Sequence, residues 1–417
     1  MVVRYRQPKH FLQFDWGSEL FQALVDAQAG VKSLQGLPYA KSWMEPLKEI
    51  ELKNEVAGTS MIEGATFTAG ELDAAFHAES PQESATRSQR QVISAKKAYL
   101  WIEQAPSDLP VRQMIEEIHK LVVTGCDDDH CTAGALRKKD ENVTFGRPPH
   151  RGAGGGAEVR RAFEALVTAA EGYYRDHDPL LQALAMHYHL GAIHPFQDGN
   201  GRCARGVEAY FLKRAGYSTH GFIGLSNYYY DERDRYLEIL ARTQQSDGNL
   251  TEYFVFGLKG IALQCARIRS VVLRENKIVL FKNMMYRVYE KNKSRKRKYL
   301  NDRQIYLLEF LLDQENQVCE RDRMIRHIQP MYRGLKRLVS ALVRDLAGLR
   351  DLGAVDWDHE KAWVILDWPQ VMTDSDFGQK ILEKPSQRGL PKLGKFWQSS
   401  LRGLCGQTIL EMPSRRG

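Results

Sequence analysis

Long apolar runs are missing from this chain. No stretch approaches the roughly 18 uninterrupted apolar residues that a membrane helix needs, and the first residues, Met1 to Gln7, lack the apolar core of a signal peptide. These absences predict a cytoplasmic protein with no membrane partner. The remaining composition, 43% hydrophobic and 27% charged over 417 residues, is that of a globular protein with two or three domains.

Cysteine is also scarce and shows no pattern. The six cysteines lack the paired spacing of a disulfide framework or a zinc site, so we expect reduced thiols. The net charge of +7 is modest, but the run KNKSRKRK at 291–298 is strongly basic. A basic run can bind nucleic acid. No aromatic or base-reading motif accompanies this one, which favours a solvated helix face or linker.

Hydrophobic periodicity predicts a mainly α-helical protein. Near the N-terminus, helix-period stretches are broken by turn signals around Gly30 and Pro38. The glycines and two prolines of 134–156 indicate an irregular extended flap inside a helical region. The predicted segments are a helical N-terminal region (1–95), a helical core (96–265), a basic helical linker (266–300), a domain of helices and a hairpin (301–368) and a tail (369–417).

Two helices on either side of a short loop stand out in the core. Asp178 and Pro179 form an N-cap and first-turn proline for a helix that runs to about Ile193. That helix is apolar nearly all round, which predicts a position at the centre of a bundle. The next helix begins near Gly201 and stops at Gly216, where a left-handed cap is expected.

The region 301–368 has a different character. Its pattern predicts helices at 305–312, 321–327 and 334–352, followed by a β-hairpin whose turn is the segment DHE. Three helices and a hairpin in this order resemble a winged-helix domain. Such a domain can bind DNA or dock a protein, and the low density of basic residues on the third helix favours docking.

The loop between the two central helices carries groups that bind phosphate. In IHPFQDGNGRCAR, residues 193–205, a Gly-Asn-Gly run opens a helix and presents several backbone N–H groups in one concavity. Arg202 and Arg205 lie three residues apart on the new helix, so we expect both to reach the same polyphosphate with fork-like hydrogen bonds.

The same loop carries groups for a reaction at phosphorus. Asp198 is a hard carboxylate suited to Mg²⁺. His194 has the side chain whose ordinary pKa suits proton abstraction near neutral pH. Either residue alone would more often be structural, but their joint arrangement at a helix start indicates metal-assisted attack of a hydroxyl on phosphorus.

At every defined position, HPFQDGNGRCAR matches HxFx(D/E)GNGRxxR, the motif of the Fic (filamentation induced by cAMP) family. The chain resembles that family over about 50–260, which implies a Fic helical bundle with a β-hairpin flap. The resemblance implies an adenylyltransferase that moves AMP from Mg-ATP to a Ser, Thr or Tyr hydroxyl of a protein. The implied roles are general base for His194, anchor for Phe196, Mg²⁺ ligand for Asp198, and nucleotide phosphate binding for Gly199, Asn200, Gly201, Arg202 and Arg205.

A second match concerns regulation. The segment TSMIEG at 59–64 resembles the family's inhibitory motif, (S/T)xxxE(G/N), in which a glutamate pairs with the second motif arginine and keeps the γ-phosphate out. Here that pair is Glu63 with Arg205. A carboxylate that bonds a guanidinium competes with phosphate for the same donors.

The resemblance also suggests how partners bind. Gly134, Arg137 and 143–147 resemble the hairpin on which family members lay target backbone, so the flap at 134–151 is expected to hold a protein substrate, which could be another copy of this chain. A homo-oligomer is left open. Among later aromatic residues, the candidates for adenine binding are Tyr229, Tyr230 and Tyr236, and core packing explains any one of them equally well.

Two alternatives stay open. The first is the reverse reaction, removal of AMP, alone or in a bifunctional enzyme, with Glu63 positioning a water. The second is a DNA-binding regulator that senses nucleotide through the core and binds nucleic acid through 301–368.

Overall fold

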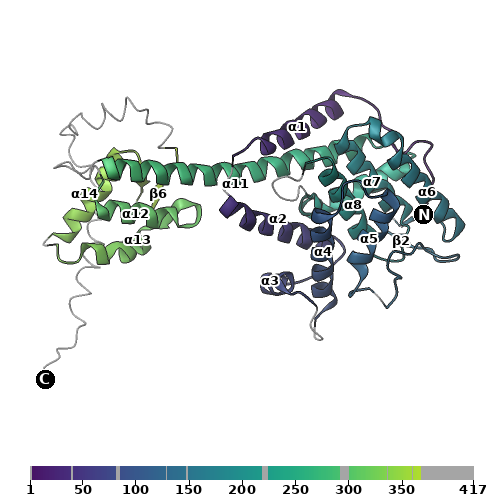
Figure 1. Cartoon of the computed structure of the whole chain (residues 1–417), viewed down its shortest axis with the longest axis horizontal. Helices are drawn as coiled ribbons and strands as arrows, with labels where there is room; N and C mark the ends of the chain where they lie inside the picture. The colour runs from purple at the N-terminus through teal and green to yellow at the C-terminus, as the bar shows by residue number, and fades with distance from the viewer. Residues whose placement is uncertain are drawn as a thin grey trace, which may run out of the picture. The chain divides into compact units, whose positions relative to one another are not determined.

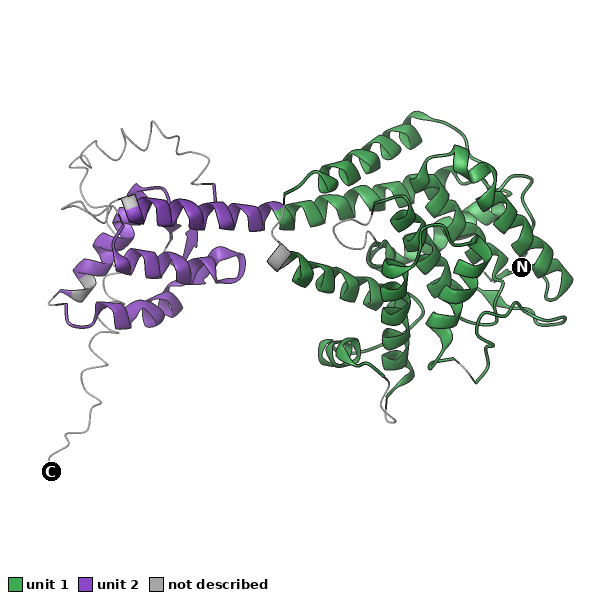
Figure 2. Cartoon of the chain, viewed as in Figure 1, with its two compact units in different colours: residues 1–272 green, residues 273–417 purple. Residues whose placement is uncertain are grey.

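The structure is a computed structural model. It describes residues 2–38, 41–80, 85–127, 129–146, 149–217, 224–291, 300–335, 337–358 and 360–367. The basic residues 292–299 and the predicted tail lie outside these ranges. The chain divides into two compact units, residues 1–272 and 273–417 (Figure 2). Within the described ranges, no helix combines the length and apolarity needed to cross a membrane.

The first unit is built almost entirely from helices (Figure 1). They are α1 (Ser18–Gln35), α2 (Lys41–Ile62), α3 (Ala69–His77), α4 (Arg87–Gln104), α5 (Val111–Val123), α6 (Ala157–Glu171), α7 (Pro179–Ile193), α8 (Asn200–Arg214), α9 (Ser226–Asp231), α10 (Arg233–Gln245), the first part of α11 (Thr251–Lys291) and the 3₁₀ turn η1 (Tyr173–Asp176).

Helix α7 lies at the centre of this unit, as its apolar sequence predicts. Nearly all of its residues are buried, and it packs closely against α8. The side chain of Asp178 accepts a hydrogen bond from the backbone N–H of Leu180 at 2.8 Å, and Pro179 occupies the first turn. The predicted cap is therefore confirmed. Gly216 has a left-handed φ of 79° just after α8.

The predicted turn at Gly30 is wrong. Gly30 lies inside α1, and a Cβ there would come within 3.0 Å of the Cβ of Cys265 on α11. The glycine therefore allows two helices to approach closely and does not break the chain. A glycine in a sequence can mark either a turn or a close approach of two helices, and local sequence alone does not distinguish the two.

The flap contains a small sheet with the order β1-β3-β2. Strands β2 (Thr144–Phe145) and β3 (His150–Arg151) are antiparallel, while β1 (Val3–Arg4) pairs with β3 in parallel. The sequence predicted the hairpin but not β1, since two residues carry no periodicity. Strand β2 is left as an edge of this sheet.

The second unit contains the rest of α11 and a compact arrangement of helices and strands. These are α12 (Asp302–Leu312), α13 (Arg321–Ile328), α14 (Leu338–Asp351), β4 (Val318–Glu320), β5 (Val355–Trp357), β6 (Lys361–Val364) and the 3₁₀ turns η2 (Glu315–Gln317) and η3 (Gln329–Tyr332). The three strands form one antiparallel sheet in the order β4-β6-β5.

Two details of the second unit differ from the sequence prediction. The last helix begins at Leu338, four residues after Gly334, because Gly334 adopts a left-handed φ of 84° that ends the preceding turn. The additional strand β4 was not predicted, since its three residues are too few to show alternation. The hairpin β5–β6 forms where the sequence places it.

Helix α2 is held tightly against the core of the first unit. A Cβ at Gly58 would lie 2.7 Å from the backbone of Ser226, so α2 touches the start of α9 directly. Glu51 of α2 pairs with Arg267 of α11 through both guanidinium nitrogens. Glu55 is buried and accepts hydrogen bonds from the hydroxyl of Tyr99 at 2.8 Å and the N–H of Ser226 at 3.0 Å.

Burial raises the pKa of Glu55 to about 7, although the hydrogen bonds from Ser226 and Tyr99 oppose this shift, and nearby Glu208 adds to it. The unfolded chain ionises this group near its ordinary pKa, so folding costs free energy once the pH exceeds that value. The contribution of Glu55 to stability is therefore fully present below about pH 4.5 and is lost as the pH rises through about 7.

We predict that Glu55→Gln removes this loss. The stability of the variant relative to wild type should rise by up to ~3 kcal/mol between mildly acidic and mildly alkaline pH. Urea unfolding at a series of pH values measures it. Glu45→Gln, at an exposed position of the same helix, serves as the control. If the difference in the free energy of unfolding between variant and wild type were the same at every pH, the raised pKa of Glu55 would be contradicted.

Candidate active site

His194 occupies the end of α7 in an unusual conformation. Its φ of 52° and ψ of 61° are left-handed, and its backbone N–H caps the helix through the carbonyl of Leu190 at 3.0 Å. The side-chain Nδ1 lies 3.0 Å from the carbonyl oxygen of Gly191. A carbonyl only accepts, so Nδ1 carries the proton and Nε2 keeps a lone pair. The imidazole can therefore accept a proton at Nε2.

The surroundings of His194 keep it neutral. Burial lowers its pKa to about 4. The ring of Phe145, from the flap strand β2, stacks on the imidazole with centroids 3.9 Å apart. This contact could not be predicted from sequence patterns, because Phe145 and His194 are far apart in the chain.

The loop after His194 is fixed by its own side chains. Asn200 accepts a hydrogen bond from the N–H of Phe196 at 2.9 Å and donates one to the carbonyl of Phe196 at 2.8 Å. The ring of Phe196 is fully buried and stacks on His119 at 3.6 Å. Gly199 has a φ of 72°, and a Cβ there would overlap Val123. Asn200 thus shapes the loop with its side chain.

Arg137 joins the flap to this loop. Its guanidinium donates to the carbonyls of His194 at 2.8 Å, Glu141 at 2.6 Å and Ala153 at 2.5 Å, and its side chain is 1% exposed. A buried group of this kind cannot touch a bound protein. Within the flap, Arg137 therefore positions the backbone around His194.

Glu63 and Arg205 meet at the start of α8. The carboxylate of Glu63 accepts a hydrogen bond from Arg205 at 2.6 Å, and Arg205 also bonds the hydroxyl and the carbonyl of Thr59 at 2.8 and 3.1 Å. A Cβ at Gly201 would overlap the Glu63 carboxylate. This carboxylate consequently lies over the N-terminal turn of α8, where the backbone N–H groups favour an anion.

Electrostatics reinforces that pair. Burial alone would raise the pKa of Glu63, but the charge and hydrogen bond of Arg205 hold it below its ordinary value. Arg205 is 2% exposed. Burial is the largest influence on its pKa and would lower it, but the charge and hydrogen bond of Glu63, together with Tyr236 and Tyr99, raise the pKa above its ordinary value. Both groups stay ionised at neutral pH, so the pair is a true ion pair.

Arg202 does not point where the sequence analysis expected. Its guanidinium bonds the carboxylate of Asp127 at 2.5 Å and the carbonyl of Val122 at 2.6 Å, and it is 2% exposed. The expectation that Arg202 and Arg205 reach into one cavity is not met here, because a buried carboxylate from the end of α5 holds Arg202. Its Nε is buried and has no hydrogen-bond partner among the described residues.

Asp198 belongs to a cluster that could hold a cation. Its carboxylate accepts hydrogen bonds from Gly199 N–H at 2.6 Å, His130 at 2.8 Å and Arg87 at 3.0 Å. Ligand atoms of Asp127, His130 and Asp198 lie within 4.8 Å of one another. Burial would raise the pKa of Asp198, but His130 and the N–H of Gly199 keep it low. An ionised, one-third exposed carboxylate fits Mg²⁺, whereas Asp127 is already held by Arg87 and Arg202.

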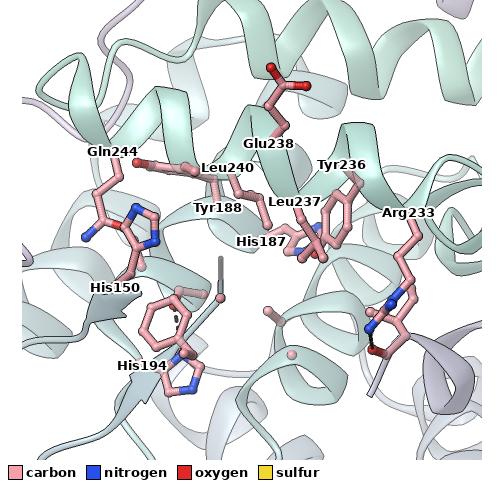
Figure 3. Close-up of a pocket in the computed structure, with 18 of the residues that line it drawn as sticks. His150, His187, Tyr188, His194, Arg233, Tyr236, Leu237, Glu238, Leu240 and Gln244 are labelled. Carbon is pink, nitrogen blue, oxygen red and sulfur yellow. Dashed lines mark hydrogen bonds between the residues drawn. The ribbon is translucent and has the colours of Figure 1, made fainter. Parts of the chain in front are cut away.

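A cavity of about 760 Å³ opens beside these groups (Figure 3). Its polar floor is formed by Glu63, His194, Gly201 and Arg205. Helix α10 supplies the opposite wall, and the residues from this helix are Arg233, Asp234, Tyr236, Leu237, Glu238, Leu240, Ala241, Arg242, Gln244 and Gln245. A wall that mixes apolar and polar side chains, facing an anion-binding floor, suits a nucleotide.

The three predicted aromatic residues lie in different places. Tyr236 lines the cavity, and its hydroxyl bonds the Nε2 of His187 at 2.9 Å. Tyr229 is fully buried behind it, with the two rings stacked at 4.6 Å. Tyr230 is 37% exposed and does not line the cavity. Tyr236 is thus the one of the three that a ligand there could touch.

Gln244 lines the cavity but was not predicted from the sequence as a site residue. Its side-chain Nε2 is buried and has no hydrogen-bond partner within the part of the chain described. Gln244 and His150 both line the cavity (Figure 3). A buried amide without a partner costs free energy unless a ligand satisfies it. The signal was weak, since Gln244 and Gln245 read as polar residues of an exposed helix face.

The comparisons agree with this geometry. Residues 109–212 match the model of the Fic/DOC family. A Fic family protein from Desulfovibrio desulfuricans superposes with a TM-score of 0.52 at 16% identity, covering 86% of this chain and 98% of its own. A Fic-1 fragment from C. elegans gives a TM-score of 0.50 at 19% identity, covering 60% of this chain and 72% of its own. No curated protein matches the sequence. The chain thus contains a Fic/DOC domain in a mainly helical Fic fold with small sheets.

Arg202 makes the stability of this domain depend on Asp127. Replacing Asp127 with alanine leaves a buried guanidinium without its carboxylate, so we predict a loss of ~3–5 kcal/mol in the free energy of unfolding. Asp129→Ala is the control, because the Asp129 side chain is 84% exposed and should change stability by less than ~0.5 kcal/mol. Equal urea midpoints for the two variants would contradict the buried pair.

Proposed function

We propose that the first unit is a protein adenylyltransferase, which transfers AMP from Mg-ATP to a Ser, Thr or Tyr hydroxyl. The observation that carries this proposal is the placement of a neutral histidine, with a free Nε2 lone pair, on the floor of a cavity that also presents Arg205 and the start of α8. Proteins of the Fic/DOC family are typically AMP transferases, which supports the same reaction.

In this proposal the cavity orients the nucleotide. The wall from α10 receives the base, with Tyr236 beside it and the unpartnered amide of Gln244 available to its polar edge. Asn200 and Gly201 present the first N–H groups of α8 to the phosphates, Gly199 forms the turn before them, and Arg205 donates to the phosphate oxygens. Arg202 lies behind this row and holds the loop through Asp127.

His194 would act as the general base. Its Nε2 accepts the proton of the attacking hydroxyl as the oxygen forms a bond to the α-phosphorus. The bond from that phosphorus to the bridging oxygen breaks, and pyrophosphate leaves with the electron pair. Mg²⁺, when held by Asp198, would neutralise charge that develops on the phosphate oxygens. The groups of the chain itself provide orientation and the proton acceptor.

The target protein would bind along the flap. Strand β2 is an edge of its sheet and carries Phe145, which stacks on His194. A target segment that pairs with this edge would bring its hydroxyl toward the imidazole. We retain the predicted segment boundaries in this proposal, with the winged-helix-like region at 301–368 as a module separate from the transferase site.

We propose that Glu63 restrains the transfer. Its carboxylate occupies the start of α8 and one donor face of Arg205, and a γ-phosphate would need both. Displacing Glu63 would free this space and let the α-phosphorus lie in line with the hydroxyl.

Removal of AMP is the second candidate. The observation that favours it is that Glu63 and His194 line the same cavity, where a carboxylate could orient a water. Incubating an AMP-modified target with the protein and measuring released AMP distinguishes the two directions.

The pKa of His194 predicts the pH dependence of the transfer. The base must be unprotonated, and a pKa held at about 4 by burial keeps it so in weak acid. Self-labelling of the Glu63→Gly variant with α-labelled ATP should therefore stay level from about pH 8 to about pH 5.5. His194→Ala should lose ~10²–10⁴-fold in rate yet retain ATP binding. A midpoint near pH 6.5, or undiminished labelling by His194→Ala, would refute this assignment.

The restraint by Glu63 is tested by its removal. We predict that Glu63→Gly raises the initial self-labelling rate by ~10–100-fold, the value of one hydrogen bond between charged groups. Glu45→Gly, at an exposed position of α2, the helix that Glu63 follows, controls for the effect of glycine on α2 and should leave the rate unchanged. Equal rates for the two variants would rule out the restraint.

A further inference from the structure

The second unit distributes its charges unevenly. The acidic side chains on α12 and at its C-terminal end have partners on α11. Tyr286 donates a hydrogen bond to Glu309, Lys282 to Asp313 at 3.4 Å, and Tyr289 to Asp302 at 2.6 Å. Asp345 of α14 is buried and taken by Arg303 at 2.7 Å. These four acidic groups therefore have local partners.

Five basic side chains on or between α13 and α14 have no such partner among the described residues. Arg323 and Arg326 on α13, Arg333 and Arg337 in the connection, and Arg344 on α14 are all exposed. In the described part of the unit, none of these five forms an ion pair with a carboxylate. By contrast, Arg350 bonds Asp356 at 2.9 Å. We call the five unpaired residues the arginine surface.

The helices give this surface a defined shape. Arg323 and Arg326 lie three residues apart and share one face of α13. Arg337 directly precedes α14 and is exposed. On α14, Ser340 and Arg344 are exposed while Ala341, Leu342 and Asp345 are buried, so Ser340 and Arg344 mark its outward face. The connection between α13 and α14 contains the turn η3 and Gly334.

We propose that the arginine surface binds double-stranded nucleic acid, with the outward face of α14 in the major groove. The groove admits one α-helix, and guanidinium groups bond both phosphate oxygens and the guanine edge. Unpaired cations on two adjacent helices match the regular negative charge of a duplex. This binding goes beyond the proposed transferase activity, since it uses neither the cavity nor the flap.

A duplex fits the surface better than an anionic membrane does. Binding a membrane surface would require a continuous apolar stripe beside the cations. Met331 and Leu335 are exposed in the connection, but Ser340 follows them on the outward face of α14.

The test uses the full chain and a fluorescent 24-base-pair duplex of mixed sequence. Anisotropy titrations at several salt concentrations should give affinity that falls steeply with salt. Arg337→Ala and Arg344→Ala should each weaken binding by ~5–10-fold and reduce the salt slope by about 1. The double variant should weaken binding by ~25–100-fold and keep its fold by circular dichroism.

The matched control is Arg160→Ala with Arg161→Ala, which removes the same charge from an exposed part of α6. We expect less than ~2-fold change for this pair, apart from the general effect of net charge. The proposal is overturned if both double variants lose affinity equally or if neither does. Tighter binding to polyglutamate, or to vesicles containing phosphatidylserine, than to the duplex would also overturn it.

Discussion

The arrangement of the first unit depends on one guanidinium. Arg205 is buried at the start of α8 and can satisfy its donors with Glu63 and Thr59 or with a polyphosphate. A buried charge without a partner costs several kcal/mol, so Arg205 needs one of these two sets of partners. The same group therefore links the cavity, the helix α2 and the proposed chemistry, and its present partner is a carboxylate of the chain.

The position of α2 decides which partner Arg205 has. Helix α2 is fixed along its length by Glu51 with Arg267, by Glu55 with Tyr99 and Ser226, and by the close approach at Gly58. These contacts place Glu63 over Gly201 without any flexible connection. Because Glu55 is a buried carboxyl, part of this docking carries a free-energy cost that depends on pH. Restraint would then be a property of helix packing as well as of the final ion pair.

Local signals in the sequence predicted much of the fold. The cap at Asp178, the apolar α7 and the β5–β6 hairpin follow from patterns within a few residues. Contacts between distant segments were not predictable in the same way. Arg202 bonds Asp127, which is 75 positions away in the chain. Gln244 can be recognised as a candidate ligand-binding residue only once the structure shows the cavity that it lines. The pairing of Glu63 with Arg205 was expected only through the resemblance to a known motif, since periodicity does not connect α2 with α8.

The central claim is that Glu63 and the γ-phosphate compete for Arg205. Isothermal calorimetry of ATP and AMP binding, with Mg²⁺ present, to wild type and to Glu63→Gly tests it directly, because AMP has no γ-phosphate. The account predicts that the substitution tightens ATP binding by ~10–100-fold and AMP binding by less than ~2-fold. Equal tightening of both nucleotides, or no change in ATP affinity, would contradict it.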